Sequence, residues 1–387
     1  MVIDGDGHIV EPLSLWKQYI PRSCQDRIYV QFGEDGLGER LVVGNVIWHL
    51  VIDRPGLGTG DFITPGGLKP GRPAARRWEQ GEHGGFDAHA RLALHDAEGI
   101  DAAVLFPTHG MDFTNTVTDP DLARVAAEAV NRWAADFCSA APDELYAVVC
   151  VTTTDPQAGA DELRRCVREY GSKAGFVRST PTADGRWLDH PSMTPIWQAA
   201  VELDVPITVH NNTTPLARWA GQDRASSFLL AHSVAHPFEA MLAFGALLQG
   251  RVFERFPTLR IGFMESGCGW APFWMERLHE HAEMMGWMFD PPLGVDPSEV
   301  FRERCVVGTE SEEREVRHVQ EMFGEETVLW ASDFPHFDTE SPFVLPRSDL
   351  TDSQRDGMYR RTALKFYRLD ESAIVRSKVR RRSETPA

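Results

Sequence analysis

Two histidines and two carboxylates stand at the ends of apolar segments that lie far apart in this 387-residue chain. Asp6 and His8 follow the first apolar run of the chain. His210 closes the run VPITVH, and Asp333 closes the run VLWASD. Imidazole nitrogen and carboxylate oxygen are the ligands that catalytic zinc, manganese and iron ions take in proteins. The residue types therefore predict one divalent metal ion held by Asp6, His8, His210 and Asp333, with zinc preferred over manganese or iron.

These side chains can meet only if the segments that carry them end at the same face of a fold. Short apolar segments alternate with amphipathic segments along most of the chain, which is the pattern of buried parallel strands and covering helices. Eight such units in order predict a (β/α)8 barrel, in which the loops after the strands form the active site at one end. We expect strands at 2–6, 102–106, 145–151, 174–177, 205–209, 260–264, 304–307 and 327–331. We expect helices at 88–98, 119–140, 157–170, 193–203, 236–256, 271–283, 312–323 and 352–367.

The chain between residues 28 and 85 interrupts this alternation. It is rich in glycine and proline and contains a possible hairpin at 39–52. Long connections in compact domains are commonly lids or arms, so we expect an insertion after the first strand that forms a lid or a dimer arm. The remainder of residues 1–375 is predicted to be a single barrel domain. Residues 376–387 carry a basic stretch that we expect to be a solvated, frayed tail.

The bulk composition limits the partners and the compartment. A net charge of −18 argues against a broad nucleic-acid interface. No run of about 18 apolar residues exists, and the N-terminus lacks the pattern of a secretory signal, so we expect no membrane partner. Six cysteines are scattered without a Cys-x-x-Cys pair, which favours a reducing cytoplasm. A small molecule remains as the expected partner.

Other polar residues also follow predicted strands. Glu265 could be a ligand or an acid–base group, or it could orient a ligand histidine. His236, expected near the start of a helix, could face the substrate and exchange protons with it. Arg178 could bind a substrate carboxylate through its forked guanidinium, and a structural ion pair is the equal alternative. Asp333 could shuttle a proton as well as bind metal.

Three more residues are candidates for the lining of a substrate site, namely His109, Trp16 and Asn211. Cys268 lacks an evident local base and is interpreted as a packing residue. No sequence pattern of a serine hydrolase, a phosphate-binding loop or a dinucleotide fold is present. Seven further histidines are interpreted as surface or packing residues, namely His83, His89, His95, His279, His281, His318 and His336.

With these motifs the chain resembles the amidohydrolase superfamily, in the amidohydrolase-2 branch related to aminocarboxymuconate-semialdehyde decarboxylase. The resemblance extends from Val2 to about Tyr367. It is carried by DGDGHIVEP from residue 4, HDAEGID from residue 95, FPT from residue 106, GRVFERFPTLR from residue 250, ESGCGW from residue 265 and ASDFPHFD from residue 331.

The resemblance implies a barrel with one divalent ion, whose ligands would fall on the four residues already singled out, and it implies a homodimer. Decarboxylases of the branch have a histidine at the end of strand 6, where this chain has Glu265. The first residue of the family's His-x-His pair is Asp6 here. The lysine that bridges two metals in binuclear relatives is missing, with Arg178 nearest to its place, which favours a mononuclear site.

We therefore expect a metal-dependent decarboxylase that acts on a small carboxylated aromatic or unsaturated substrate. Glu265 or His236 would supply the proton to carbon. The alternative is a hydrolase of an amide, lactone or C–C bond, in which Asp333 or Glu265 takes the proton of a metal-activated water. A barrel that binds a ligand without turnover is the third interpretation, motivated by the replacement of the strand-6 histidine.

Overall fold

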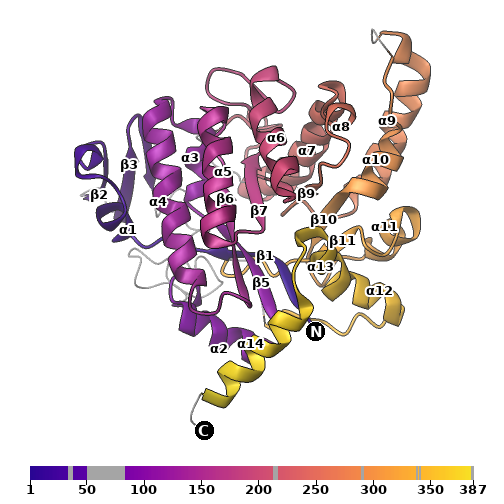
Figure 1. Cartoon of the computed structure of the whole chain (residues 1–387). Helices are drawn as coiled ribbons and strands as arrows, with labels where there is room; N and C mark the ends of the chain where they lie inside the picture. Colours follow the sequence, from indigo (N-terminus) through magenta and orange to yellow (C-terminus); the bar gives the residue numbers. More distant parts are fainter. Residues whose placement is uncertain are drawn as a thin grey trace.

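The computed structural model describes residues 1–33, 38–49, 83–211, 217–288, 292–336, 339 and 341–384. Eight parallel strands follow one another in chain order around a barrel (Figure 1). The strands are β1 (Ile3–Ile9), β5 (Ala102–Pro107), β6 (Leu145–Cys150), β7 (Ala174–Arg178), β8 (Ile207–His210), β9 (Ile261–Phe263), β10 (Cys305–Thr309) and β11 (Val328–Trp330). The predicted (β/α)8 barrel is confirmed.

The first strand meets the last one through the main chain of the segment that follows β11. The amide of His8 donates to the carbonyl of Phe334 at 2.8 Å, and the amide of Asp333 donates to the carbonyl of Asp6 at 3.1 Å. The buried carboxylate of Asp4 accepts hydrogen bonds from the amide and the hydroxyl of Ser332. These contacts fix two of the predicted ligands, Asp6 and Asp333, relative to each other.

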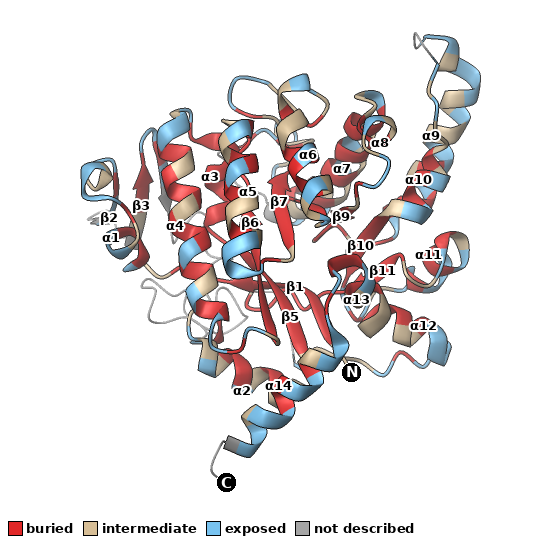
Figure 2. Ribbon diagram, viewed as in Figure 1, coloured by how far each residue is buried: buried red, intermediate tan, exposed pale blue. Residues whose placement is uncertain are grey.

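Every residue of these strands is buried, whereas most of the helices around them have both buried and exposed residues (Figure 2). Helix α3 (Gly110–Thr116) is the exception, because all of its residues are buried. The burial of the strands explains why they read as continuous apolar runs. The exception among the strands is β1, which is fully buried although it contains Asp4, Asp6 and His8. It also extends to Ile9, beyond the predicted end at residue 6, so Asp6 and His8 lie within the strand. Two residues apart, their side chains share one face.

The helices are α1 (Leu15–Gln18), α2 (Ala88–Glu98), α3 (Gly110–Thr116), α4 (Pro120–Cys138), α5 (Pro156–Tyr170), α6 (Thr194–Leu203), α7 (Phe228–Gln249), α8 (Val252–Arg255), α9 (Trp270–Met285), α10 (Pro297–Arg304), α11 (Val316–Phe323), α12 (Asp352–Asp356), α13 (Thr362–Tyr367) and α14 (Glu371–Glu384), with a π-helical turn at Gly357–Arg361. The side chain of Asp119 caps α4, and Pro120 occupies its first turn. Asp155 and Pro156 begin α5 in the same way.

The predicted start of helix α7 is wrong, with consequences for the site. The sequence predicts a helix at 236–256 that begins at His236. Helix α7 instead begins at Phe228, where the hydroxyl of Ser227 accepts a hydrogen bond from the amide of Leu230, and Pro237 lies inside the helix. His236 is therefore in the middle of α7. The helices α3 and α10 were not predicted at all.

The predicted insertion contains a small antiparallel sheet of β2 (Ile28–Gly33), β3 (Gly38–Val43) and β4 (Val46–His49). The expected hairpin at 39–52 corresponds to β3 and β4. Arg27 pairs with the capping residue Asp119 at 2.6 Å, which ties this sheet to the start of α4. Residues 50–82, the greater part of the expected lid or arm, lie outside the described residues.

The expectation of a frayed basic tail is wrong as far as Glu384, because residues 371–384 form α14. The Lys378 ammonium is buried and donates to Asp101 at 2.7 Å. Arg381 pairs with Glu144 at 2.7 Å and with Asp96 at 2.6 Å. The basic residues of α14 thus pair with acidic residues from distant parts of the chain.

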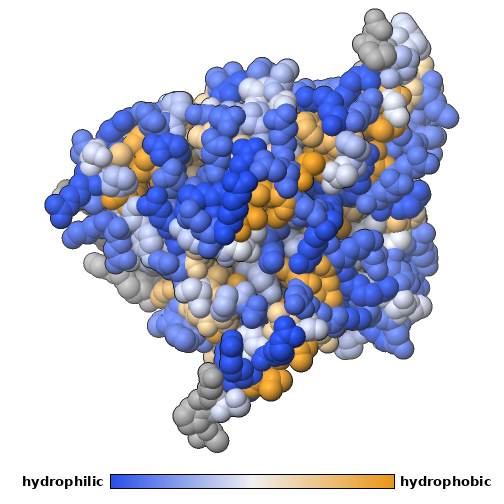
Figure 3. All heavy atoms as spheres, viewed as in Figure 1, coloured by the Kyte–Doolittle hydropathy of each residue, from blue (hydrophilic) through white to orange (hydrophobic). Residues whose placement is uncertain are grey.

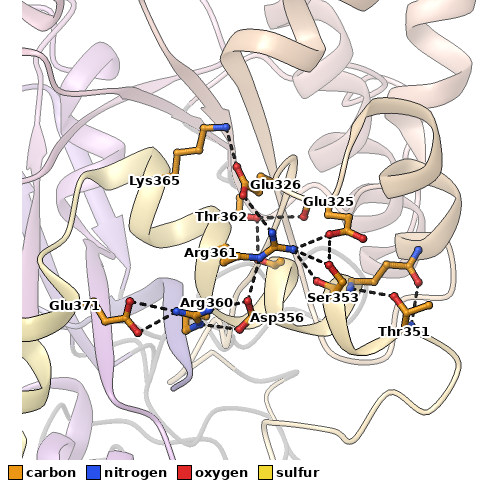
Figure 4. Close-up of polar contacts among 12 residues, drawn as sticks. Glu325, Glu326, Thr351, Ser353, Asp356, Arg360, Arg361, Thr362, Lys365 and Glu371 are labelled. Atoms are coloured by element: carbon orange, nitrogen blue, oxygen red, sulfur yellow. Dashed lines mark hydrogen bonds and ion pairs between the residues drawn. The ribbon is translucent and has the colours of Figure 1, made fainter.

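A second group of ion pairs joins the π-helical turn to its neighbours. Arg360 lies between Asp356 and Glu371, and Arg361 pairs with Glu325 (Figure 4).

Hydrophilic side chains cover most of the molecular face seen in Figure 3, in keeping with the net charge of −18. Among the described residues, no helix has both the length and the apolar character that a bilayer span requires.

Candidate active site

The structure brings the four predicted metal ligands together at the barrel end where the strands terminate. Asp6 and His8 come from β1, His210 ends β8, and Asp333 follows β11. The Nε2 atom of His8 lies 3.2 Å from Oδ1 of Asp333 and 3.6 Å from Oδ1 of Asp6. The Nε2 atom of His210 lies 3.7 Å from Oδ2 of Asp6. All four side chains are buried.

Several polar atoms of this cluster face its centre without a regular hydrogen bond. Among the described residues, both carboxylate oxygens of Asp6 and the Nε2 atoms of His8 and His210 lack such a partner. The Nδ1 atoms point the other way, His8 towards the carbonyl of Pro107 at 3.3 Å and His210 towards that of Asn211 at 2.9 Å. Each Nδ1 therefore carries the ring proton, and each Nε2 keeps a lone pair directed at the centre.

Burial sets the protonation state of these groups. It lowers the pKa of His8 to about 4 and that of His210 well below its usual value, so both rings are neutral at pH 7. Burial raises the pKa of Asp6 well above its usual value, and the negative charges of Asp333 and Asp4 add to this effect. Neutral imidazoles beside crowded carboxylates form a donor set that a divalent cation would complete. The residues present thus fit the expected metal ion.

His336 belongs to the site, and its interpretation as a surface or packing residue is wrong. Its Nδ1 atom lies 2.9 Å from both carboxylate oxygens of Asp333, and its ring centre lies 4.2 Å from that of His8. Burial would raise the pKa of Asp333, but the imidazole of His336 reverses this and lowers it. His336 lies three residues after Asp333 in the sequence, and the turn at residues 333–336 brings the two side chains into contact.

Glu265 follows β9 and lies between two groups of histidines. Its Oε2 atom is 3.4 Å from Nε2 of His210, and its Oε1 atom is 3.6 Å from Nδ1 of His236. The same Oε1 atom is 4.0 Å from Nε2 of His232, a residue that the sequence analysis did not single out. Glu265 and Asp333 both have a left-handed backbone, with φ of 46° and 54°, a conformation that non-glycine residues adopt at an energetic cost and that is concentrated at functional sites.

An open cavity of about 250 Å³ lies at this end of the barrel. Its walls include Asp6, His232, His236, Glu265 and Asp333. Burial lowers the pKa of His236 to about 3, so this ring also is neutral at pH 7. The cavity therefore combines two of the predicted metal ligands, Asp6 and Asp333, with the neighbouring imidazole of His236 and carboxylate of Glu265.

The four predicted substrate-binding residues are not among the residues that line this cavity. Arg178 is buried and pairs with Asp112 at 2.7 Å. The side-chain amide of Asn211 donates to the carbonyl of Ala235. Trp16 is buried with its ring edge-on to Phe113, and His109 is buried at the start of α3. Their contact with substrate remains a prediction.

The chain matches the amidohydrolase family model, Amidohydro_2, over residues 3–369, and it belongs to that family. The resemblance inferred from the motifs is confirmed. The chain is 26% identical over 306 residues to gamma-resorcylate decarboxylase of Rhizobium sp. (strain MTP-10005), a match that covers 76% of this chain and 91% of that protein. It is 25% identical over 266 residues to 2-amino-3-carboxymuconate-6-semialdehyde decarboxylase of Dictyostelium discoideum, covering 66% and 70%.

Solved structures share the barrel. An amidohydrolase from Mycobacterium avium subsp. paratuberculosis K-10 superposes with a TM-score of 0.76 at 23% identity, covering 95% of this chain and 98% of that one. A 5-carboxyvanillate decarboxylase from Novosphingobium aromaticivorans DSM 12444, complexed with manganese and 4-hydroxy-3-methoxy-5-nitrobenzoic acid, superposes with a TM-score of 0.68 at 22% identity, covering 95% and 96%. These likenesses show the common fold.

Proposed function

We propose that this protein is a metal-dependent decarboxylase of a small aromatic or unsaturated carboxylate. The observation that carries the proposal is the arrangement at the barrel end. Neutral imidazoles and carboxylates with unsatisfied atoms converge on one point, beside a carboxylate–imidazole pair in an open cavity. The decarboxylase relatives support the same reaction for the family member described here.

Asp6, His8, His210 and Asp333 would hold one divalent ion. Two nitrogen and two oxygen donors suit zinc, as expected from the sequence, and the hard carboxylate oxygens suit manganese as well. The manganese in the related 5-carboxyvanillate decarboxylase supports the second choice. When bound, the ion would supply positive charge to the substrate carboxylate and to an oxygen beside it.

Decarboxylation requires that the carbon which loses CO₂ receives a proton. Two observations support Glu265 and His236 in this role: both line the cavity, and Oε1 of Glu265 lies 3.6 Å from Nδ1 of His236. In its protonated form Glu265 gives the proton to carbon, with the neutral imidazole of His236 beside it. The C–C bond to the carboxylate breaks, the electrons of that bond restore the unsaturated system as CO₂ leaves, and Glu265 regains a proton from water. His336 holds Asp333 in position through its Nδ1 atom.

Glu265, in the place of the histidine that branch decarboxylases use, also favours a second candidate. In a hydrolase of an amide, lactone or C–C bond, Glu265 or Asp333 would take the proton of an attacking water. The two functions differ in their products. A ligand-binding barrel without turnover would not need an acid–base pair beside the metal ligands.

The test is a substrate screen of the purified chain supplied with zinc or manganese. We expect CO₂ release from a hydroxylated benzoate, such as 2,6-dihydroxybenzoate, or from an unsaturated acid. Amides and lactones are screened in parallel, and His210→Ala is the control that should lose the activity. Hydrolysis without CO₂ release would favour the hydrolase, and turnover of neither class by the metal-loaded chain would favour the ligand-binding barrel.

The expected assembly and compartment also remain proposals. Apolar side chains are exposed on α9 and on the turn that follows it, among them Phe273 at 63% and Trp287 at 75%. Such exposure is typical of a surface that another chain covers, so we expect a homodimer, which light scattering in solution would detect. All six cysteines are free thiols, which supports a cytoplasmic location.

A further inference from the structure

Helix α7 presents two histidines to the cavity. His232 and His236 are four residues apart, so they lie on the same face of the helix one turn from each other. Their ring centres are 4.4 Å apart. The side chain of His232 is 29% exposed and that of His236 is buried, so the pair extends from the cavity mouth to its wall. Only His236 has a role in the proposed reaction.

Glu265 presents one oxygen to each of two separate groups. Its Oε2 atom faces His210, a predicted ligand of the first ion, at 3.4 Å. Its Oε1 atom faces His236 at 3.6 Å and His232 at 4.0 Å. His232, His236 and Glu265 each offer one potential ligand atom, and these three atoms lie within 4.8 Å of one another.

We propose that His232, His236 and Glu265 form a second divalent-cation site, which shares the cavity with the first. Two imidazoles and one glutamate with an open fourth position form a donor set that zinc takes in proteins. Zinc bonds of about 2.0–2.2 Å in a tetrahedron place the ligand atoms about 3.4 Å apart. The observed separations of 3.6 and 4.0 Å from the shared oxygen require only small side-chain movements to reach this value.

The surroundings favour a cation at this position. Both ring nitrogens of His236 are buried without a hydrogen-bond partner among the described residues. The cavity lining also contains Glu310 and Glu313, and no lysine or arginine occurs among the described lining residues. The carboxylate of Glu265 between the two sites would reduce the repulsion between two ions. The partial exposure of His232 gives the ion a route from solvent.

Occupation of this site would change the activity. An ion held by His236 and Glu265 occupies the lone pairs through which the proposed reaction moves its proton. We therefore expect the second ion to inhibit decarboxylation. This consequence rests on the proposed function, whereas the binding itself does not.

Equilibrium dialysis against excess Zn²⁺, followed by elemental analysis, tests the site without any substrate. We expect two ions on the wild-type chain in excess zinc and one after dialysis against metal-free buffer. His232→Ala should retain the first ion, which reports an intact fold, and should bind the second at least about 100-fold more weakly, since even the loss of an outer-shell partner costs about 10–100-fold. His318→Ala, which removes an exposed histidine of α11, is the matched control and should bind two.

A wild-type chain that never exceeds one ion, or a His232→Ala chain that still takes up two, would overturn the proposal. If the alanine variant loses the first ion as well, His232→Gln, which keeps the side-chain volume, replaces it in the same comparison. Once a substrate is in hand, excess Zn²⁺ should lower the rate of the wild type and of His318→Ala, and should leave the rate of His232→Ala unchanged. An equal fall in all three chains would contradict the inhibitory role.

Discussion

The barrel end and the ion-pair group around Arg360 and Arg361 both contain several charged side chains, but these side chains differ in burial and in hydrogen bonding. In the ion-pair group each guanidinium meets carboxylates directly, as with Arg360 and Asp356 at 2.6 and 2.8 Å (Figure 4). These side chains are partly exposed. At the barrel end the carboxylate of Asp6 is fully buried, and neither of its oxygens has a hydrogen-bond partner among the described residues.

The energies of the two regions differ accordingly. A partly exposed ion pair contributes about 0.2–1 kcal/mol to the stability of a protein. A buried polar atom without a partner costs about 1–3 kcal/mol. The ion-pair group therefore stabilises the fold without a further partner. The polar atoms without a hydrogen bond at the barrel end destabilise the fold, and a bound cation would remove this cost. The contrast supports the proposal that the barrel end is the functional site, and the following changes would break or sharpen it.

The largest effect is expected at Asp333. The substitution Asp333→Asn keeps the size of the side chain but removes the negative charge that would bind the metal and that His336 holds in place. We expect kcat/KM to fall by about 10,000-fold, at the upper end of acid–base contributions, because ligation and proton transfer are both affected. Steady-state kinetics on the substrate found in the screen measures this. A loss below tenfold would exclude Asp333 from the site.

A smaller loss is expected at Glu265. The substitution Glu265→Gln removes the acid–base group and leaves the four ligands of the first ion intact. We expect kcat to fall by about 100-fold, with KM and the content of the first ion nearly unchanged. Kinetics and elemental analysis on the same preparation give both values. If the first ion is lost together with the activity, Glu265 is a ligand of that ion rather than a proton-transfer group.

The third prediction concerns the effect of Glu11 on stability. Glu11 is a buried carboxylate that has hydrogen bonds but no proposed cation. Its oxygens accept from the amides of Thr108, His109 and Gly110, and burial raises its pKa from 4.5 to about 7. The folded state then prefers the protonated form, so this contribution to stability is complete below pH 4.5 and is lost as the pH rises through about 7. A shift of this size corresponds to about 3 kcal/mol.

Urea unfolding of the wild type and of Glu11→Gln at pH 5 and pH 8 measures this contribution. The difference in unfolding free energy between the two chains should move in favour of the variant from pH 5 to pH 8 by about 2.5 kcal/mol, because the unfolded chain is already partly ionised at pH 5. A difference that stays constant between the two pH values would show that Glu11 titrates equally in the folded and unfolded chains.

The smallest effect is expected in the ion-pair group. Arg360→Ala should lower the unfolding free energy by about 1 kcal/mol or less, because its partners are partly exposed to water. Metal content and activity should be unchanged. Urea unfolding and kinetics on one preparation check both statements. Loss of the first metal ion in this variant would show that the two regions are coupled, against the contrast drawn above.

The barrel was predictable because its strands are buried on both faces and read as short apolar runs. The ligands were predictable for the same reason, since Asp6, His8, His210 and Asp333 stand within or directly after those runs. Residues that reach the site from elsewhere were harder to predict. His336 depends on the turn after Asp333, and His232 depends on a helix that begins eight residues earlier than the sequence pattern suggested.

The C-terminal segment shows the same limit. From the sequence, residues 376–382 are a run of like charges, which favours exposure to solvent. In the structure Lys378 and Arg381 meet Asp96, Asp101 and Glu144, which lie more than 230 residues away in the chain. Ion pairs at such separations leave no local pattern. The fold and the ligand set could therefore be read from local signals, whereas the partners of α14 could not.

The central claim is that the unsatisfied nitrogen and oxygen atoms at the barrel end bind one divalent ion. The most direct measurement is elemental analysis of the wild type, His210→Ala and Arg360→Ala, each purified without added metal. We predict about one ion per chain in the wild type and in Arg360→Ala, and a loss of that ion in His210→Ala. A wild-type chain that holds no ion even after reconstitution with zinc or manganese would contradict the account.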